Sequence, residues 1–377
     1  MSQWIKTKLG EIVILNYGKA LKAQDRNAGS IPVYSSGGLT GWHNKALINE
    51  QGIIIGRKGT VGKAYLTYGP FWCIDTAYYI LPNPSKYDFV FLFYLLKTLG
   101  LEELNEDSAV PGLNRDTAYS QEILLPSLPE QKAIASVLSS LDDKIDLLHR
   151  QNKTLESMAE TLFRQWFDVD SNDEWQEKNV LDIFTLVGGG TPKTSVAEYW
   201  TDEIPWISGG DISAAHQGYL YSTEKSISLA GLQNSSAKLL PKNSTVISAR
   251  GTVGKYALLA RDMAFSQSNY GIVSKIGSYP FFIYLLVGFI VDDLLTAAYG
   301  SVFDTITTRT FESVNLKFPS LNSIEKFNEE ISPIFSKKET NTQQIKTLEN
   351  LRDTLLPKLM SGEVRVQYAE EAIASVA

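Results

Sequence analysis

The sequence predicts an α+β protein in which two related mixed α/β modules are joined by two long helices. These helices are expected to pair as an antiparallel coiled coil around a pseudo-two-fold axis. Three observations predict this architecture: short motifs repeat at a constant offset, both halves contain short β-type apolar runs, and both contain a long stretch with apolar residues at heptad spacing. Such a tandem duplication is typical of a protein that contacts two similar targets, or one target at two points.

The duplication rests on three unlike motifs that keep their spacing over about half of the chain. Gly-Thr-Val-Gly-Lys recurs at an offset of 192, and the other two motifs recur at 193. The paired segments are 59–63 with 251–255, 125–128 with 318–321, and 154–156 with 347–349. Trp4 and Trp175 open the two modules at an offset of only 171, so the second module should contain about 21 additional residues between positions 188 and 240.

These offsets divide the chain into a first module at 1–128, a helical segment at 129–173, a second module at 174–321, a second helical segment at 322–365 and a tail at 366–377. β-Branched and aromatic runs between Gly and Pro predict strands in both modules. The expected strands are 53–55, 61–66 and 78–81, then 246–248, 253–259 and 271–274. Apolar stretches without Pro predict helices at 87–99 and 281–295.

The two helical segments show the heptad pattern. Residues in steps of three and four form the first seam: Leu138, Leu141, Ile145, Leu148, Asn152, Leu155, Ala159, Leu162 and Trp166. The second seam contains Ile331, Ile334, Ile345, Leu348, Leu355 and Leu359, with polar interruptions at Lys338, Asn341 and Arg352. Asn152 could set the register of the pair, or it could face a partner or water at a local gap. A capping-box pattern at 127–130 starts the first helix, and Pro357 and Gly362 are expected to end or kink the second.

Neither amphipathic helix can bury its apolar stripe alone, so the two should pair with each other. A helix of about 39 residues spans roughly 58 Å. The first helix delivers the chain to the second module, and the second helix must run back to pair with it. The expected result is an antiparallel rod with one module near each end.

Composition excludes several classes of site. Cys73 is the single cysteine, and His43, His149 and His216 are not clustered in sequence, so a disulfide framework or a metal site is not expected. The first residues lack the pattern of a signal peptide, and the apolar run at 281–291 is too short and interrupted to span a bilayer. These features predict a cytoplasmic protein without a membrane segment.

The Gly-Lys pairs at 62–63 and 254–255 are not P-loops. A P-loop requires a glycine where this chain has Arg57 and Ala249, and Ser or Thr where it has Ala64 and Tyr256. A methyltransferase motif of the Asn-Pro-Pro-Tyr type is also lacking, and 83–85 reads Asn-Pro-Ser. The sequence therefore predicts no catalytic residues.

The net charge of −7 is unusual for a nucleic-acid-binding chain. Segments 129–173 and 322–377 carry −4 and −2, whereas 1–128 carries +1 and 174–321 carries −2. If the modules bind DNA, other subunits must supply much of the phosphate neutralisation.

At this point the motifs resemble those of a known family, the specificity subunits of type I restriction–modification enzymes. The residues that carry the resemblance are the Pro-Ser-Leu-Pro-Glu-Gln entry at 126–131, the Leu-Glu to Leu cores at 155–162 and 348–355, the closing Leu-Met-Ser-Gly at 359–362, and the Gly-Thr-Val-Gly-Lys elements. The second helical segment departs from the Pro-Glu-Gln entry and has Asn-Ser-Ile-Glu at 322–325.

The resemblance implies a DNA-reading scaffold in which each module, a target-recognition domain, reads one half of a bipartite asymmetric site in double-stranded DNA. It implies two adenine methyltransferase subunits docked on the helices and a separate restriction subunit that translocates and cleaves DNA. S-adenosylmethionine, ATP and Mg would be bound by those partners, and this chain would hold no cofactor.

The DNA-contact candidates are polar and basic residues in glycine-rich or turn-forming segments. They are Lys19, Ser35, Ser36, Arg57, Lys58, Lys63, Asn114, Arg115, Lys193, Ser208, Arg250, Lys255, Thr307 and Arg309. For each, the structural alternative is a tight turn or a solvated loop. Trp72, Tyr78, Tyr94 and Tyr270 are expected in the core rather than as stacking platforms for bases.

Two other functions remain open at this point. A bivalent protein that binds no DNA could use the coiled coil only as a spacer, and an enzyme could form its site between the two modules. The scarcity of His and Cys argues against the enzyme.

Overall fold

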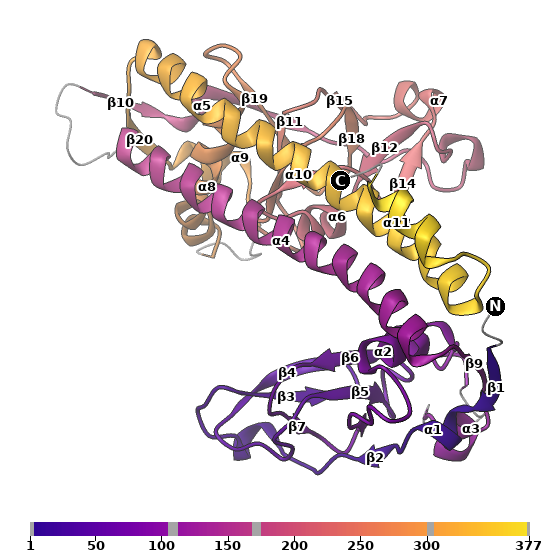
Figure 1. The fold of residues 1–377 in the computed structure, drawn as a ribbon. Helices are drawn as coiled ribbons and strands as arrows, with labels where there is room; N and C mark the ends of the chain where they lie inside the picture. The colour runs from indigo at the N-terminus through magenta and orange to yellow at the C-terminus, as the bar shows by residue number, and fades with distance from the viewer. Residues whose placement is uncertain (1–3, 105–111, 168–174, 300–304, 375–377) are drawn as a thin grey trace. The chain divides into compact units, whose positions relative to one another are not determined.

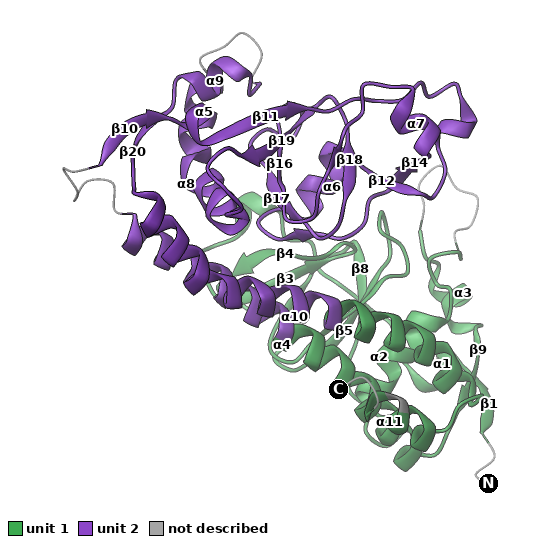
Figure 2. Cartoon of the chain, turned by 90° about the horizontal axis from the view of Figure 1, so that it is seen from above, with its two compact units in different colours: residues 1–147, 345–377 green, residues 148–344 purple. Residues whose placement is uncertain are grey.

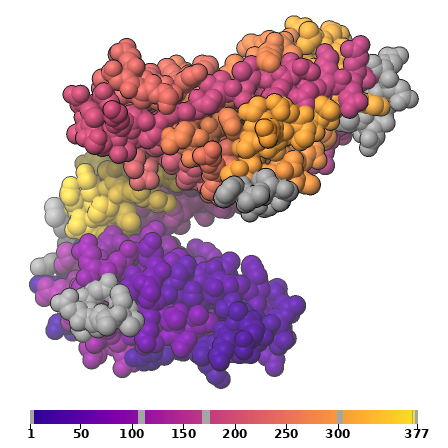
Figure 3. All heavy atoms as spheres, turned by 180° about the vertical axis from the view of Figure 1, so that it is seen from behind, coloured from indigo at the N-terminus to yellow at the C-terminus, as the bar shows by residue number. Residues whose placement is uncertain are grey.

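The structure, a computed structural model, describes residues 4–104, 112–167, 175–299 and 305–374 (Figure 1). The chain forms two compact units, 1–147 with 345–377 and 148–344 (Figure 2). Each unit holds one mixed module and part of both long helices. Each module comes from a contiguous stretch of chain, indigo to purple for the first and rose to orange for the second (Figure 3).

The first module contains three groups of paired strands. β1 (Ile5–Lys8) pairs with β9 (Glu122–Leu125). An antiparallel sheet has the order β2 (Asn16–Tyr17), β8 (Ala77–Ile80), β5 (Gly52–Gly56) and β6 (Ala64–Thr67). A smaller sheet has the order β4 (Gly38–His43), β3 (Ile31–Ser35) and β7 (Trp72–Cys73). The helices are α1 (Leu9–Ile12), η1 (Ala23–Asp25), α2 (Phe89–Thr98) and α3 (Arg115–Tyr119).

The second module repeats this plan. β10 (Gln176–Asn179) pairs with β20 (Asn315–Phe318). The larger sheet is β11 (Phe184–Gly188), β19 (Asn269–Ser274), β16 (Thr245–Ser248), β17 (Tyr256–Leu259) and β13 (Tyr219–Leu220). The smaller sheet is β14 (Lys225–Ile227), β12 (Ile204–Ile207), β18 (Met263–Phe265) and β15 (Leu239–Leu240). The remaining short helices are α5 (Val180–Ile183), η2 (Ala197–Tyr199), α6 (Gly209–Ala214), α7 (Leu229–Gln233) and α9 (Thr308–Glu312).

The extra residues of the second module lie where the motif offsets place them. Only Ser36 and Gly37 separate β3 from β4, whereas β12 and β14 are separated by 208–224, which contains α6 and β13. α7 and β15 follow before β16. β13 and β15 extend the two sheets at their edges, so the insertion leaves the shared strand order intact.

The expected apolar strands and helices form, with two differences. The strands expected at 61–66 and 253–259 begin only at Ala64 and Tyr256, because the glycine-rich motif before each of them forms a turn. α8 (Pro280–Tyr299) is longer than expected and is long and apolar enough to cross a membrane, so the expectation of too short a run was wrong. The helix continues through Asp292 and Asp293, and Phe282, Leu286 and Ile290 are buried in the core of unit 2. This packing accounts for its apolar composition.

α4 (Leu128–Trp166) and α10 (Leu321–Ser361) are the two long helices, and they pack antiparallel as predicted. In unit 2, the contacts pair Asn152 with Thr342, Glu156 with Lys338 and Trp166 with Glu330, so the α10 number falls as the α4 number rises. In unit 1, Arg352 Nη1 contacts Asp142 Oδ1 at 2.8 Å. The polar interruptions expected in the second seam are therefore partners of polar groups on α4.

The apolar seam is buried as the heptads predict, with one shift at its end. Leu138, Leu141, Ile145, Leu148, Ile345, Leu348 and Leu355 are buried. Leu155, Leu162 and Trp166 are only partly buried, whereas Phe163 and Phe167 are buried among aromatic rings of α8 and α10. The seam turns toward the second module there, because α8 offers additional apolar surface.

Pro357 neither ends nor breaks α10, which continues to Ser361. Gly362 follows with φ +75°, a left-handed conformation that suits glycine at the end of a helix. The tail, for which the sequence indicates no structure, forms α11 (Val366–Ala374), and its Ala369 is buried.

Candidate nucleic-acid interface

The Gly-Thr-Val-Gly-Lys motif forms the same turn in both modules. In the first, Gly62 N donates to Gly56 O at 2.9 Å, and in the second Gly254 N donates to Ser248 O at 3.0 Å. The two glycines of each motif have φ between +77° and +82°, a region that favours glycine. The motif is thus a tight turn with an exposed lysine, Lys63 or Lys255, after it.

Three connections of the first module come together beside this turn. Ser36 N, in the β3–β4 hairpin, donates to Thr76 Oγ1 at 3.3 Å. A Cβ added to Gly59 would lie 3.6 Å from Ser36 Oγ, and one added to Gly37 would lie 3.8 Å from Thr60 Oγ1. The predicted residues Ser35 and Ser36 therefore lie next to the turn that carries Lys63.

A groove of about 420 Å³ in the first module is lined by four of the predicted residues, Arg57, Lys58, Asn114 and Arg115, together with Tyr17 and Tyr78 among others. Backbone pairing holds its two sides together. Lys58 forms a β-bridge with Gly112, and Leu113 N donates to Arg57 O at 2.8 Å. Segments more than fifty residues apart in sequence thus place their basic side chains in one groove.

Both arginines of this groove lie against tyrosine rings. The Cζ atoms of Arg57 and Arg115 lie 5.3 and 5.4 Å from the ring centre of Tyr17, within the range of a cation–π interaction. Arg57 also lies 5.9 Å from the Tyr78 ring, and its Nε and Nη2 donate to Asp75 O at 3.2 and 2.8 Å. Arg57 is therefore fixed in place by the protein.

Tyr17 and Tyr78 form an aromatic platform beside these arginines, and Tyr78 is held firmly in the fold. Tyr78 is buried as expected for a core residue, and its Oη donates to Leu113 O at 3.1 Å. Burial, reinforced by neighbouring Tyr17, raises the pKa of Tyr78 to about 12 although both arginines lower it. Tyr78 thus remains a protonated donor at neutral pH. Tyr17 is half exposed and lies opposite Tyr78 in the sheet.

Sequence reasoning missed Tyr17, and only strand register identifies it. β2 has two residues, and no periodicity marks so short a strand. In the second module, Gly188 lies opposite Tyr270 as Tyr17 lies opposite Tyr78. The aromatic platform is therefore absent from the equivalent place in the second module.

The remaining equivalences follow from one shared hydrogen bond. Ile306 N donates to Ala249 O at 3.0 Å, as Leu113 N donates to Arg57 O. Ala249 therefore replaces Arg57, and Thr308 replaces Arg115 as the first residue of the following short helix. The predicted residues Arg250, Thr307 and Arg309 are exposed here.

Two predicted polar residues cap helices. Asn114 Oδ1 accepts a hydrogen bond from Asp116 N at 2.8 Å at the start of α3. Ser208 Oγ accepts a hydrogen bond from Asp211 N at 3.3 Å at the start of α6. Gly209 O accepts from Thr252 Oγ1 at 3.1 Å, so Ser208 lies beside the second glycine-rich turn as Ser36 lies beside the first.

Lys19 and Lys193 are exposed outside these clusters. Lys19 follows β2, and its carbonyl accepts from Trp72 Nε1 at 2.8 Å. Lys193 precedes η2, and its carbonyl accepts from Trp200 Nε1 at 3.3 Å.

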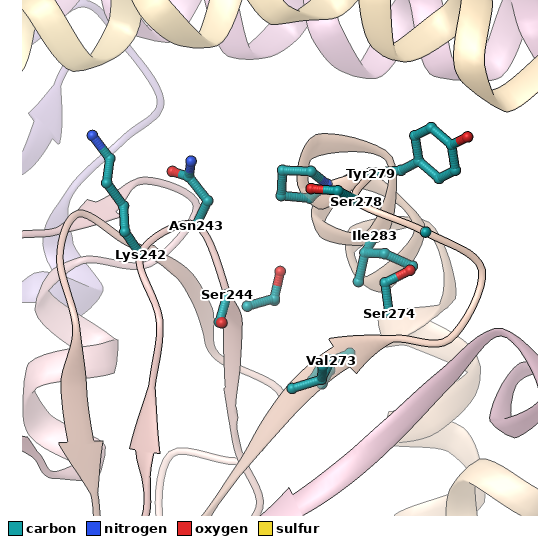
Figure 4. Close-up of a pocket in the computed structure, with 12 residues that line it drawn as sticks. Lys242, Asn243, Ser244, Val273, Ser274, Ser278, Tyr279 and Ile283 are labelled. Atoms are coloured by element: carbon teal, nitrogen blue, oxygen red, sulfur yellow. The ribbon is translucent and has the colours of Figure 1, made fainter.

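A second pocket, of about 390 Å³, lies in unit 2 and contains none of the predicted residues (Figure 4). Lys242 and Asn243 stand on one side of it, with Ser278 and Tyr279 opposite. Lys242 Nζ is paired with Glu339 at 2.6 Å. The described residues contain no group of His, Cys, Asp or Glu side chains that could hold a metal ion.

Comparison with known proteins identifies the architecture. The family model for the type I restriction modification DNA specificity domain matches residues 1–157 and 172–351. The chain belongs to this family. The MjaIX specificity subunit of Methanocaldococcus jannaschii is 28% identical over 302 residues, which cover 74% of this chain and 69% of that protein. The HindI specificity subunit of Haemophilus influenzae is 22% identical over 378 residues, covering 78% and 81%.

A solved structure has the same fold. The S subunit of a type I restriction–modification system from M. genitalium superposes with a TM-score of 0.65, at 16% identity and over 95% of this chain and 96% of that chain. The protein is thus a DNA-recognition subunit of a type I restriction–modification system, and it is a non-catalytic member of that complex. Its partners are DNA and the other subunits of the system. This excludes the DNA-independent scaffold and the enzyme considered from sequence.

Proposed function

We propose that the specificity subunit reads a bipartite, asymmetric DNA site, with one part contacted by residues 1–128 and the other by 174–321. The observation that supports this proposal most directly is that the two modules share strand order and the glycine-rich turn but differ in side chains at equivalent positions. Tyr17, Arg57 and Arg115 in the first correspond to Gly188, Ala249 and Thr308 in the second. A common framework with different side chains suits two different half-sites.

Within each module, we propose that the loops around the glycine-rich turn form the DNA-contacting surface. In the first module these are the segments with Ser35, Ser36, Lys63 and the groove residues. Lys19 is a further candidate, because it lies two positions after the groove residue Tyr17 in sequence. In the second they include Ser208, Arg250, Lys255, Thr307 and Arg309, and Lys193 is a more distant candidate. Exposed lysines suit phosphate contacts, whereas arginines also suit the edge of guanine.

We further propose that segments 129–173 and 322–365 act as a spacer on which two adenine methyltransferase subunits dock, and that a restriction subunit joins them. The boundary near 173 lies outside the described residues. The chain is acidic overall, so basic partner subunits would neutralise much of the DNA charge. The complex would act in the cytoplasm, where the chromosome is located.

Exchange of one module tests the proposal. Residues 174–321 are replaced by the equivalent module of another specificity subunit, and the methylated sites of cells expressing the complex are mapped by sequencing. One half of the site should change while the other half and the spacer persist. The reciprocal exchange of 1–128 is the matched control and should change the other half. A change in both halves from a single exchange would show that the modules do not read independently.

The partner assignment has its own test. The tagged subunit is expressed with the methyltransferase and restriction subunits of its system, and the mass of the purified complex is measured. We expect two methyltransferase subunits for each specificity subunit. A complex with one methyltransferase subunit would contradict the stoichiometry without affecting the half-site proposal.

A further inference from the structure

We propose that Arg115 determines specificity in the first module by hydrogen bonding to a guanine of its half-site, and that the second module has no counterpart of this contact. The inference rests on the proposed reading of one half-site by residues 1–128. It goes further by naming one side chain and one base.

The position of Arg115 is fixed from both sides. It is the first residue of α3, which starts at the cap formed by Asn114. Its backbone follows Leu113, whose N donates to Arg57 O across the groove. The backbone at Arg115 is therefore held in place through Leu113 by the segment that follows β5, and it does not belong to a free loop.

The guanidinium is held between two aromatic rings. Its Cζ lies 5.4 Å from the ring centre of Tyr17 and 6.0 Å from that of Tyr119. Tyr119 is itself anchored, because its Oη accepts a hydrogen bond from Leu15 N at 2.9 Å. Contact with ring faces restrains a planar guanidinium while its N–H edge stays available for hydrogen bonding.

Arg115 differs from its neighbour in having unused donors. Arg57 donates two hydrogen bonds to Asp75 O. Within the described part of the chain, the guanidinium of Arg115 has neither a hydrogen bond nor an ion pair, and the residue is exposed. A restrained, solvent-facing fork of donors with no acceptor among the described residues indicates an external ligand with two adjacent acceptors.

Among the acceptors of double-stranded DNA, guanine matches this fork best. Its O6 and N7 accept two parallel hydrogen bonds from one arginine in the major groove. Phosphates also accept from arginine, but Lys58 and Lys63 are exposed nearby and meet that requirement without a restrained geometry. Asp116 also lines the groove, and its carboxylate disfavours a phosphate at this point.

The second module supports a contact specific to the first. Thr308 stands at the position of Arg115, and Gly188 stands at that of Tyr17. Glu312, the fifth residue of α9, stands at the position of Tyr119 in α3. The second module therefore lacks the arginine and both tyrosine rings at these positions. The two half-sites should differ in this guanine contact.

The test uses the whole complex with Arg115→Ala and Arg115→Lys. Lys45→Ala is the matched control, because Lys45 is an exposed basic residue of the same module outside the proposed DNA-contacting surface. Methylated sites are mapped in cells that express each variant. Both Arg115 variants should keep the second half-site and the spacer but accept any base at one guanine position of the first half-site. Discrimination at that position should fall by roughly 5- to 150-fold, the value of one bidentate contact. Lys45→Ala should leave the sequence of the site unchanged.

A second measurement changes the DNA instead of the protein and can be made on the wild-type complex. Wild-type complex is bound to duplexes in which single guanines of the first half-site are replaced by 7-deazaguanine, which lacks the N7 acceptor. Affinity should fall at one guanine, and Arg115→Ala complex should not distinguish that duplex from the unmodified one. The wild-type result is decisive even if Arg115→Ala misfolds. If the wild-type complex binds every substituted duplex as tightly as the unmodified one, the proposal is overturned.

The outcomes separate the inference from the proposed function. An unchanged site in Arg115→Ala, or a uniform loss of affinity with a salt slope lower by about one, would overturn the guanine contact, the latter in favour of a phosphate contact. A wild-type complex whose methylated sites are not bipartite would instead overturn the proposed function.

Discussion

The side-chain amide of Asn341 donates a hydrogen bond to Asn152 Oδ1 at 3.0 Å, in the seam between α10 and α4. Asn341 is fully buried, and Asn152 Nδ2 in turn donates to Thr342 Oγ1 at 3.1 Å. A polar pair inside a seam is satisfied in only one register, so it selects that register at some expense of stability. We therefore expect Asn152 to set the register of the helix pair.

This pair predicts a non-additive mutational effect. Asn152→Leu leaves the buried amide of Asn341 without that acceptor and should lower the free energy of unfolding by about 1–3 kcal/mol. Asn152→Leu combined with Asn341→Leu should lower it by less than the single change, because neither amide is then left unpaired. Chemical unfolding followed by circular dichroism measures both variants. A double variant less stable than Asn152→Leu would argue against the pairing.

Adjacent leucines on α4 give a matched pair of tests for the seam. Leu148 is 2% exposed and Leu147 is 42% exposed. Leu148→Asp places a carboxylate in the apolar seam and should destabilise the helix pair by at least about 3 kcal/mol. Leu147→Asp should change stability by about 0.5 kcal/mol or less, as is usual for surface positions. Thermal unfolding compares the two, and equal losses would show that Leu148 does not face the seam.

The ion pair of Lys338 with Glu156 should behave as a buried pair. Lys338 is 4% exposed, and Tyr284 Oη also donates to Glu156 Oε1 at 3.1 Å. Burial lowers the pKa of Lys338 to about 8. Lys338→Met should cost about 3–5 kcal/mol, because it leaves the carboxylate buried and uncompensated.

The control for this variant removes both charges. Lys338→Met combined with Glu156→Gln should recover most of the loss in the free energy of unfolding, since no buried charge then remains. Urea unfolding of the wild type and the two variants supplies the comparison. Failure of the second change to recover stability would mean that the lysine acts through packing alone.

The length of the helices should set the spacer of the DNA site. α4 and α10 each run through both compact units as continuous helices. Insertion of one heptad into each helix, at paired positions, keeps the seam in register and adds about 10.5 Å. At 3.4 Å for each base pair, the unread spacer should lengthen by roughly three base pairs.

Mapping of methylated sites in cells carrying the lengthened subunit decides this prediction. Insertion into only one helix is the control and should disrupt pairing and methylation together. A lengthened subunit that still binds its partners and methylates with the original spacer would show that another element sets the distance.

The sequence by itself determined the duplication, the two long helices and the apolar seam. These features are local or periodic: a motif repeats itself, and a heptad can be read along a single helix. The same reading also located the insertion in the second module, because an offset between repeats measures inserted length directly. It treated Lys338, Asn341 and Arg352 only as interruptions, since their partners on α4 lie about 180 to 210 residues away.

Only the tertiary structure decided which side chains meet. Tyr17 belongs to a strand too short to carry a pattern, and its position over the groove follows from register with Tyr78. Phe163 replaces Leu162 in the buried surface because α8 packs beside α4 there. The groove combines residues from β2, from the segment that follows β5 and from α3. The order of these segments in the sequence does not reveal that they converge in the fold. Contacts between distant segments depend on strand register and helix packing, which the whole fold determines.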